Sequence, residues 1–112
     1  MLTRPHLATK LTYWSNATAF VRPSHHPIPL GNEPTNTPRL ALRWLQTRAA
    51  HIADQLDPAE SRPALHWLED HQEHEHALHL LTQGAAYRFT IYDDTTRYVL
   101  TARQVQLQGH RL

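Results

Sequence analysis

The chain has 112 residues, no cysteine and a net charge of +1, and no segment approaches the roughly 20 consecutive apolar residues of a membrane span. The absence of cysteine excludes disulfides, thiolate zinc sites and a cysteine nucleophile. The length and the 40% hydrophobic content predict a single folded domain rather than a disordered chain. The first residues contain no apolar segment, so we expect no signal peptide and a cytoplasmic location.

The charges are unevenly distributed along the chain. Residues 1–50 carry six cations and one acid, residues 51–83 carry one cation and seven acids, and residues 84–112 carry four arginines and two acids. An acidic middle therefore lies between two basic ends. Such asymmetry either guides a partner or is neutralised by pairing within the fold.

The first predicted element is a β-hairpin over residues 10–22. Two runs rich in threonine, aromatic and β-branched residues flank residues 15–18, where Asn16 suits a turn. Residues 23–37 follow as a proline-rich connector, because proline disfavours helix and interior strand. We expect this connector to pack across the surface or to carry function.

Two helices are predicted next, over residues 38–56 and 58–83. Thr37 is a good N-cap and Pro38 a good first helical residue. The second helix has a start signal at Asp57 and another at Ser61, and Gly84 is its natural stop. The apolar stripe of the first helix consists of Ala41, Leu42, Leu45, Ala49, Ile52 and Leu56.

A second hairpin is predicted over residues 85–103, with residues 93–96 as its turn. The strands then pair from Tyr92 with Arg97 to Tyr87 with Ala102, and successive pairs alternate between the two faces of the hairpin. One face is apolar and the other is polar. Residues 104–112 form a polar tail that frays, unless Val105 and Leu107 extend the strand.

The predicted order is β-β-α-α-β-β, which indicates a small α+β domain. An isolated hairpin is only marginally stable. The most economical arrangement joins both hairpins into one antiparallel sheet and covers its apolar face with the helix pair.

The most unusual segment is the His-rich stretch 66–79, with five histidines and four acids. On a helical wheel, His71, His74 and Glu75 project within the apolar arc and lie three or four residues apart. Two imidazoles and a carboxylate suit zinc or another divalent metal. Candidates for a further ligand are His25, His26 and His51. The alternatives are a solvated or internally paired helix face and a pH-responsive contact.

Two surfaces are candidates for binding a partner. The polar face of the second hairpin combines arginine and tyrosine, which are enriched in protein interfaces and also hold phosphates and stack on bases. The acidic helix face could mimic phosphate to a nucleic-acid-binding partner. The hairpin candidates are Arg88, Tyr92, Arg97 and Arg103, and the helix candidates are Glu69, Asp70, Glu73 and His76.

The sequence contains no Gly-rich phosphate loop and no recognisable nucleophile motif. We therefore expect a non-enzymatic cytoplasmic regulator or inhibitor that binds a protein partner and needs no cofactor. Accessory proteins of bacterial mobile elements share this profile. The alternatives are a nucleic-acid-binding protein that uses the Arg/Tyr face and a His/Glu metal-binding protein. A homodimer is predicted through apolar residues of the first hairpin, namely Tyr13, Trp14, Phe20 and Val21.

Overall fold

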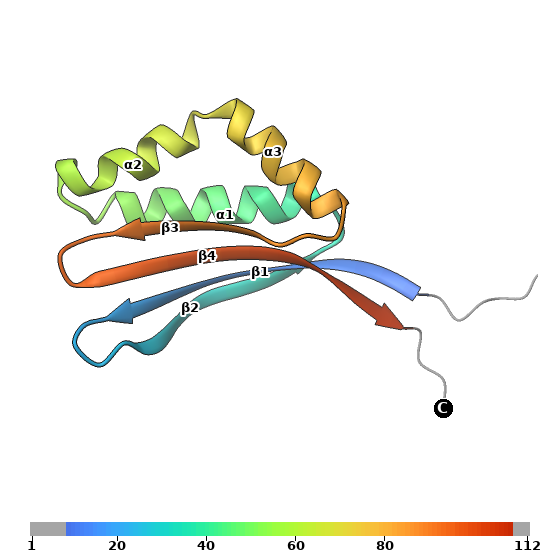
Figure 1. Cartoon of the computed structure of the whole chain (residues 1–112), viewed down its shortest axis with the longest axis horizontal. Helices are drawn as coiled ribbons and strands as arrows, with labels where there is room; N and C mark the ends of the chain where they lie inside the picture. The colour runs from blue at the N-terminus through green and yellow to red at the C-terminus, as the bar shows by residue number, and fades with distance from the viewer. Residues whose placement is uncertain (1–8, 109–112) are drawn as a thin grey trace, which may run out of the picture.

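The computed structural model describes residues 9–108, which form one antiparallel sheet of four strands and three helices. The strands are β1 (Thr9–Val21), β2 (His26–Thr35), β3 (Tyr87–Tyr92) and β4 (Thr96–Gln108), and the helices are α1 (Pro38–Ala53), α2 (Pro58–Leu68) and α3 (His71–Thr82). The strands lie in the order β2-β1-β4-β3, and the helices lie together on one side of the sheet (Figure 1). The predicted α+β class is confirmed, with three helices instead of two.

The first hairpin is longer than the sequence predicts, and its turn lies elsewhere. The predicted turn at residues 15–18 is wrong, because β1 runs straight through it. The chain reverses at Arg22–His25 instead, and the segment predicted as a connector, 23–37, contains β2. The backbone of Arg22 donates to the carbonyl of Thr95 at 2.9 Å, which links this turn to the one between β3 and β4.

Tertiary contacts explain why β1 stays extended through its middle. It pairs with β2 along one edge and with β4 along the other. Ser15 is fully buried, and its hydroxyl donates to the Ala41 carbonyl of α1 at 3.2 Å. The three prolines of β2 fit an edge strand, where outward-facing positions need no amide to complete the sheet.

The predicted second helix, 58–83, is divided in two. The chain leaves helical geometry after Leu68, and Asp70 begins α3 by accepting a hydrogen bond from the Glu73 amide on its carboxylate at 3.1 Å. This is the bond that a good N-cap provides. By contrast, the predicted start of the first helix is confirmed, since the Thr37 hydroxyl accepts from the Leu40 amide at 3.1 Å.

The second hairpin has the register that the sequence predicts, from Tyr87 opposite Ala102 to Tyr92 opposite Arg97. For residues 104–108 the fraying tail is wrong and the alternative, in which Val105 and Leu107 extend the strand, is confirmed, because β4 continues to Gln108 and pairs with β1 along its whole length. Residues 109–112 of that tail lie outside the described residues. Among the described residues, no helix is long and apolar enough to cross a membrane.

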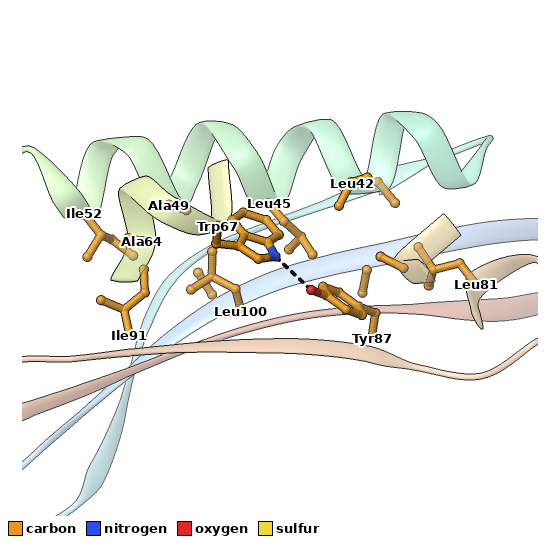
Figure 2. Close-up of a cluster of buried hydrophobic side chains, with 14 of the residues drawn as sticks. Leu42, Leu45, Ala49, Ile52, Ala64, Trp67, Leu81, Tyr87, Ile91 and Leu100 are labelled. Atoms are coloured by element: carbon orange, nitrogen blue, oxygen red, sulfur yellow. Dashed lines mark hydrogen bonds between the residues drawn. The ribbon is translucent and has the colours of Figure 1, made fainter. Parts of the chain in front are cut away.

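The core lies between the helices and the sheet, with Trp67 of α2 near its centre (Figure 2). The Trp67 ring stacks on Phe89 with centroids 4.4 Å apart. Its indole N–H donates to the Tyr87 hydroxyl at 2.8 Å, and this hydroxyl in turn donates to the Glu73 carboxylate at 2.8 Å. Burial, together with the hydrogen bond to Glu73, raises the pKa of Tyr87.

We expect Tyr87→Phe to lower the free energy of unfolding by about 1–3 kcal/mol, because it leaves the buried Trp67 N–H without an acceptor. Tyr92→Phe is the matched control, since the Tyr92 side chain is 62% exposed. Urea denaturation of both variants measures the difference. An equal loss in the two variants would contradict the structural role of the Tyr87 hydroxyl.

The raised pKa of Tyr87 also predicts a loss of stability in alkali. An unfolded tyrosine loses its proton near pH 10, while folded Tyr87 keeps it to higher pH. The folded state then binds more protons than the unfolded state, so stability falls as the pH rises through and above about 10. Thermal melts between pH 8 and pH 11 should show a smaller loss for Tyr87→Phe than for the wild type. Some loss should remain, because burial and nearby Asp93 also raise the pKa of Tyr98.

Candidate binding surface

The helices cover one face of the sheet and leave the opposite face open, which we call the uncovered face. Side chains alternate between the two faces along each strand. Ser15 and Phe89 mark the covered face, because they contact α1 and α2. The strand registers place the remaining side chains in rows across the uncovered face. These rows are Pro27–Phe20–Arg97–Tyr92, Pro29–Thr18–Val99–Thr90, Asn32–Asn16–Thr101–Arg88 and Pro34–Trp14–Arg103.

Three aromatic rings stand on the uncovered face, and they differ in exposure. Trp14 and Phe20 are half-buried, whereas Tyr92 is 62% exposed. The Arg97 guanidinium lies 4.4 Å from the centroid of the Phe20 ring, in a cation–π contact. Phe20, Tyr92 and Arg97, together with Arg22 and Asp93 from the adjoining turns, line a hollow of about 290 Å³ at the end of the sheet, whereas Trp14 lies outside it.

The uncovered face is basic. Its rows contain three arginines and no carboxylate, and the side chains of Arg88 and Arg103 are exposed. The ten carboxylates of the chain lie elsewhere: seven in the helical segment 54–75, two in the turn between β3 and β4, and one at Glu33. Glu33 pairs with Ser15 and is therefore on the covered side of the sheet. The uncovered face thus carries cations without acids, whereas the acids of the helical layer lie at residues 54–75, after an α1 that carries Arg39, Arg43 and Arg48 and no acid.

The structure brings together the four predicted hairpin residues Arg88, Tyr92, Arg97 and Arg103 on the uncovered face. Sequence reasoning did not place Trp14 and Phe20 beside them, because it divided β1 into a hairpin. The sequence signal for this placement was the alternation along β1 between side chains that are buried and side chains that lie on the uncovered face. The covered positions are Tyr13, Ser15, Ala17 and Ala19, all buried, while the uncovered ones are Trp14, Asn16, Thr18 and Phe20.

The predicted acidic helix face is less available for binding than its composition indicates. Asp70 caps α3, and Glu73 accepts the Tyr87 hydroxyl. Glu69 and His76 are exposed. Half of the predicted acidic contact set therefore already has hydrogen-bond partners within the fold.

His74 of the His-rich stretch is part of the core. It is only 7% exposed, and its ring lies edge-on to Trp67 with centroids 5.1 Å apart. Its Nε2 donates to the Trp67 carbonyl at 2.7 Å, and its Nδ1 accepts from the Gln46 side-chain amide at 3.3 Å. With both ring nitrogens in hydrogen bonds, His74 has no lone pair left for a metal.

The other proposed metal ligands, His71 and Glu75, are exposed. Within the described part of the chain, no three His, Asp or Glu side chains are grouped so that they could hold a metal ion. The structure therefore does not assemble the predicted site of His71, His74 and Glu75.

The predicted dimer contacts are also divided between two environments. Tyr13 is 6% exposed and belongs to the core, so it is not available to a second copy. Val21 borders an apolar hollow beside Ile52 on the covered side. Trp14 and Phe20 lie on the uncovered face. The four residues do not form one contact surface.

The chain matches no protein-family model, no curated protein and no solved structure. The chemistry of the uncovered face is therefore the basis for the function proposed below.

The bonding of His74 leads to a test of its structural role. We expect His74→Ala to destabilise the fold by about 1–3 kcal/mol, because it removes a buried ring that packs edge-on to Trp67 and one of the two hydrogen bonds to the Trp67 carbonyl, the other coming from the Asp70 amide. His71→Ala, at an exposed position of the same helix, should change stability by less than about 0.5 kcal/mol. Urea denaturation compares the variants. A wild-type melting temperature that rises with zinc and falls with chelator would show instead that metal binds the folded state.

Proposed function

We propose that the protein is a non-enzymatic binding protein whose uncovered face binds single-stranded nucleic acid. The observation that carries the proposal is the composition of that face, where all charged side chains in the four rows are arginines and three aromatic rings lie among them. Arginine stays protonated at all physiological pH values and offers a planar set of donors that matches phosphate. It suits anion binding rather than proton transfer.

The arrangement fits a single strand better than a duplex. Unpaired bases present flat faces that stack on aromatic rings, while their phosphates need cations nearby. On the uncovered face, Tyr92 lies beside Arg97 in one row and Trp14 lies beside Arg103 in another. Rings and cations therefore alternate at the spacing of neighbouring strands, about 5 Å. In a duplex the bases are stacked on each other and do not expose their faces.

A net charge of +1 argues against nucleic-acid binding only if acidic and basic side chains are interspersed over the whole surface. Here the acids lie in the helical layer, in the turn between β3 and β4, and on the covered side of β2. A polyanion would be attracted to the uncovered face and repelled by the acids of residues 54–75, although α1 also carries arginines. This polarity favours the nucleic-acid hypothesis over the sequence-based expectation of a protein partner, although an acidic protein surface would also complement these arginines.

The proposal retains two expectations from the sequence, a cytoplasmic location and a regulatory role. A small protein that covers a single strand blocks access to it, which is one way to act as a regulator or inhibitor. The origin in a bacterial mobile element stays a hypothesis that this surface does not address.

The experiment measures fluorescence anisotropy of labelled 20-nucleotide oligo(dT) and oligo(U), and of a DNA duplex of equal length, between 50 and 300 mM salt. We expect single strands to bind more tightly than the duplex. The logarithm of the binding constant should fall linearly with the logarithm of the salt concentration, with a slope near −0.7 for each phosphate contacted. Tyr92→Ala and Trp14→Ala should each weaken binding by about tenfold, which corresponds to the lower part of the range for stacking on a base.

Arg88→Ala should weaken binding and make the salt slope shallower, whereas Arg43→Ala is the matched control. Arg43 is an exposed arginine on α1, in the opposite layer. Absence of binding at 50 mM salt would refute the proposal. Equal effects of Arg88→Ala and Arg43→Ala would show that the uncovered face is not the site. Capture of an acidic protein that depends on Arg88, without any oligonucleotide binding, would restore the protein-partner hypothesis.

A further inference from the structure

The two edges of the sheet differ in their ability to accept another strand. On one edge, β2 contains Pro27, Pro29 and Pro34, which interrupt its row of amide donors. On the other edge, β3 has the sequence Tyr-Arg-Phe-Thr-Ile-Tyr, without proline and with a single charge. Proline and charge are the usual means by which an edge strand avoids pairing with another chain. The β2 edge has this protection, and the β3 edge largely lacks it.

The ladder between β3 and β4 determines which backbone groups of β3 point outward. The Asp93 amide donates to the Thr96 carbonyl at 3.0 Å, so Asp93 belongs to the set of residues that bond β4. Antiparallel pairs alternate between bonded and non-bonded positions. The amide and carbonyl groups of Arg88, Thr90 and Tyr92 therefore face away from β4, toward the open edge.

We propose that β3 pairs antiparallel with β3 of a second copy of this chain, about a twofold axis at Thr90. In this register Thr90 lies opposite Thr90 of the second copy, and Arg88 lies opposite Tyr92 of the second copy. The outward amide and carbonyl groups of Arg88, Thr90 and Tyr92 in one copy then all pair with those of the other copy. An isologous contact of this kind closes after two copies and leaves no further edge of the same type.

Charge complementarity favours β3 of a second copy, rather than an unrelated strand, as the partner of β3. The segment around β3 is basic near its start, at Arg88, and acidic just after its end, at Asp93 and Asp94. Antiparallel self-pairing brings the start of one segment to the end of the other. Arg88 then lies diagonally across from Asp94 of the second copy, within reach of a long side chain. The same pairing places Arg88 in the row beside Tyr92 of the second copy, so a cation again neighbours a ring, as Arg97 neighbours Phe20.

This dimer would extend the proposed binding surface without being needed for it. A twofold axis perpendicular to the sheet leaves both uncovered faces on the same side. The two sheets would then form one continuous platform with Arg88 and Tyr92 of both copies at its centre. The sequence-based expectation of a homodimer is thus moved from β1 to β3.

The first test is the oligomeric state of the full chain by light scattering between 5 and 300 µM. We expect the wild type to shift from monomer to dimer and Thr90→Pro to stay monomeric, because proline removes the outward amide at the axis. Thr90→Ala is the matched control, since it shortens the side chain but keeps that amide, and it should dimerise. A wild type that is monomeric at 300 µM, or a Thr90→Pro variant that dimerises as the wild type does, would overturn the proposal.

The second test does not depend on the stability of the proline variant. The chain has no cysteine, so Thr90→Cys introduces a single thiol. Directly opposed residues of a bonded antiparallel pair have Cα atoms about 5.5 Å apart, which is within the range of a disulfide. Mild oxidation should link Thr90→Cys into a covalent dimer. The control is Thr18→Cys, which lies in the same row but two strands inward.

In the proposed dimer the two Thr18 positions are about 24 Å apart, five strand spacings, so they should not link. Equal cross-linking of the two variants, or none for Thr90→Cys, would contradict the register. These readouts contain no nucleic acid, so failure of the dimer and failure of the proposed binding function are distinguishable.

Discussion

The hydrogen bond from the Trp67 indole to the Tyr87 hydroxyl holds the C-terminal helices to the sheet, and other features of the structure depend on it. Helices as short as α2 and α3 are marginal alone, so tertiary contacts must stabilise them. Trp67 provides three such contacts. Its ring stacks on Phe89, its N–H binds Tyr87, and its carbonyl accepts from His74 of α3. One residue, through its side chain and its carbonyl, therefore joins the end of α2, the first turns of α3 and the edge strand β3.

The sequence predicted the elements whose information is local. The register of the second hairpin follows from strict alternation between Tyr87 and Ala102, and the start of α1 follows from the cap at Thr37. It did not predict β1, because a turn propensity near Asn16 was stronger, locally, than any signal for an extended chain. Pairing with β4, which is more than 70 residues away along the chain, decides the outcome there. Long-range pairing leaves little trace in a short window of sequence.

The three residues of the predicted metal site do not lie together in the described structure for a related reason. The helical wheel treated residues 58–83 as one helix, so the direction of each side chain was counted from Trp67 onward. The chain breaks at Asp70, and a break resets the direction in which later side chains point. The signal for the break was present, because Asp70 followed three residues later by Glu73 is a typical N-terminal cap of a helix. His74 faces the core, as the wheel indicated, but its nitrogens bind a carbonyl and an amide there, while His71 and Glu75, which the wheel also placed in the apolar arc, are exposed.

Separation of charge between the two layers explains how a nearly neutral chain can present a strongly basic surface. Net charge is a sum over the whole molecule, but a partner at the uncovered face experiences mainly the charges within the screening distance, about 8 Å at physiological salt. Arg88, Arg97 and Arg103 would lie within that distance of a strand bound as proposed, whereas the helical carboxylates lie behind the sheet. The thickness of the protein itself therefore weakens the opposing field. The sequence shows the charges as blocks along the chain, but only the fold places them on particular surfaces. That placement governs the charge that a partner meets at the uncovered face.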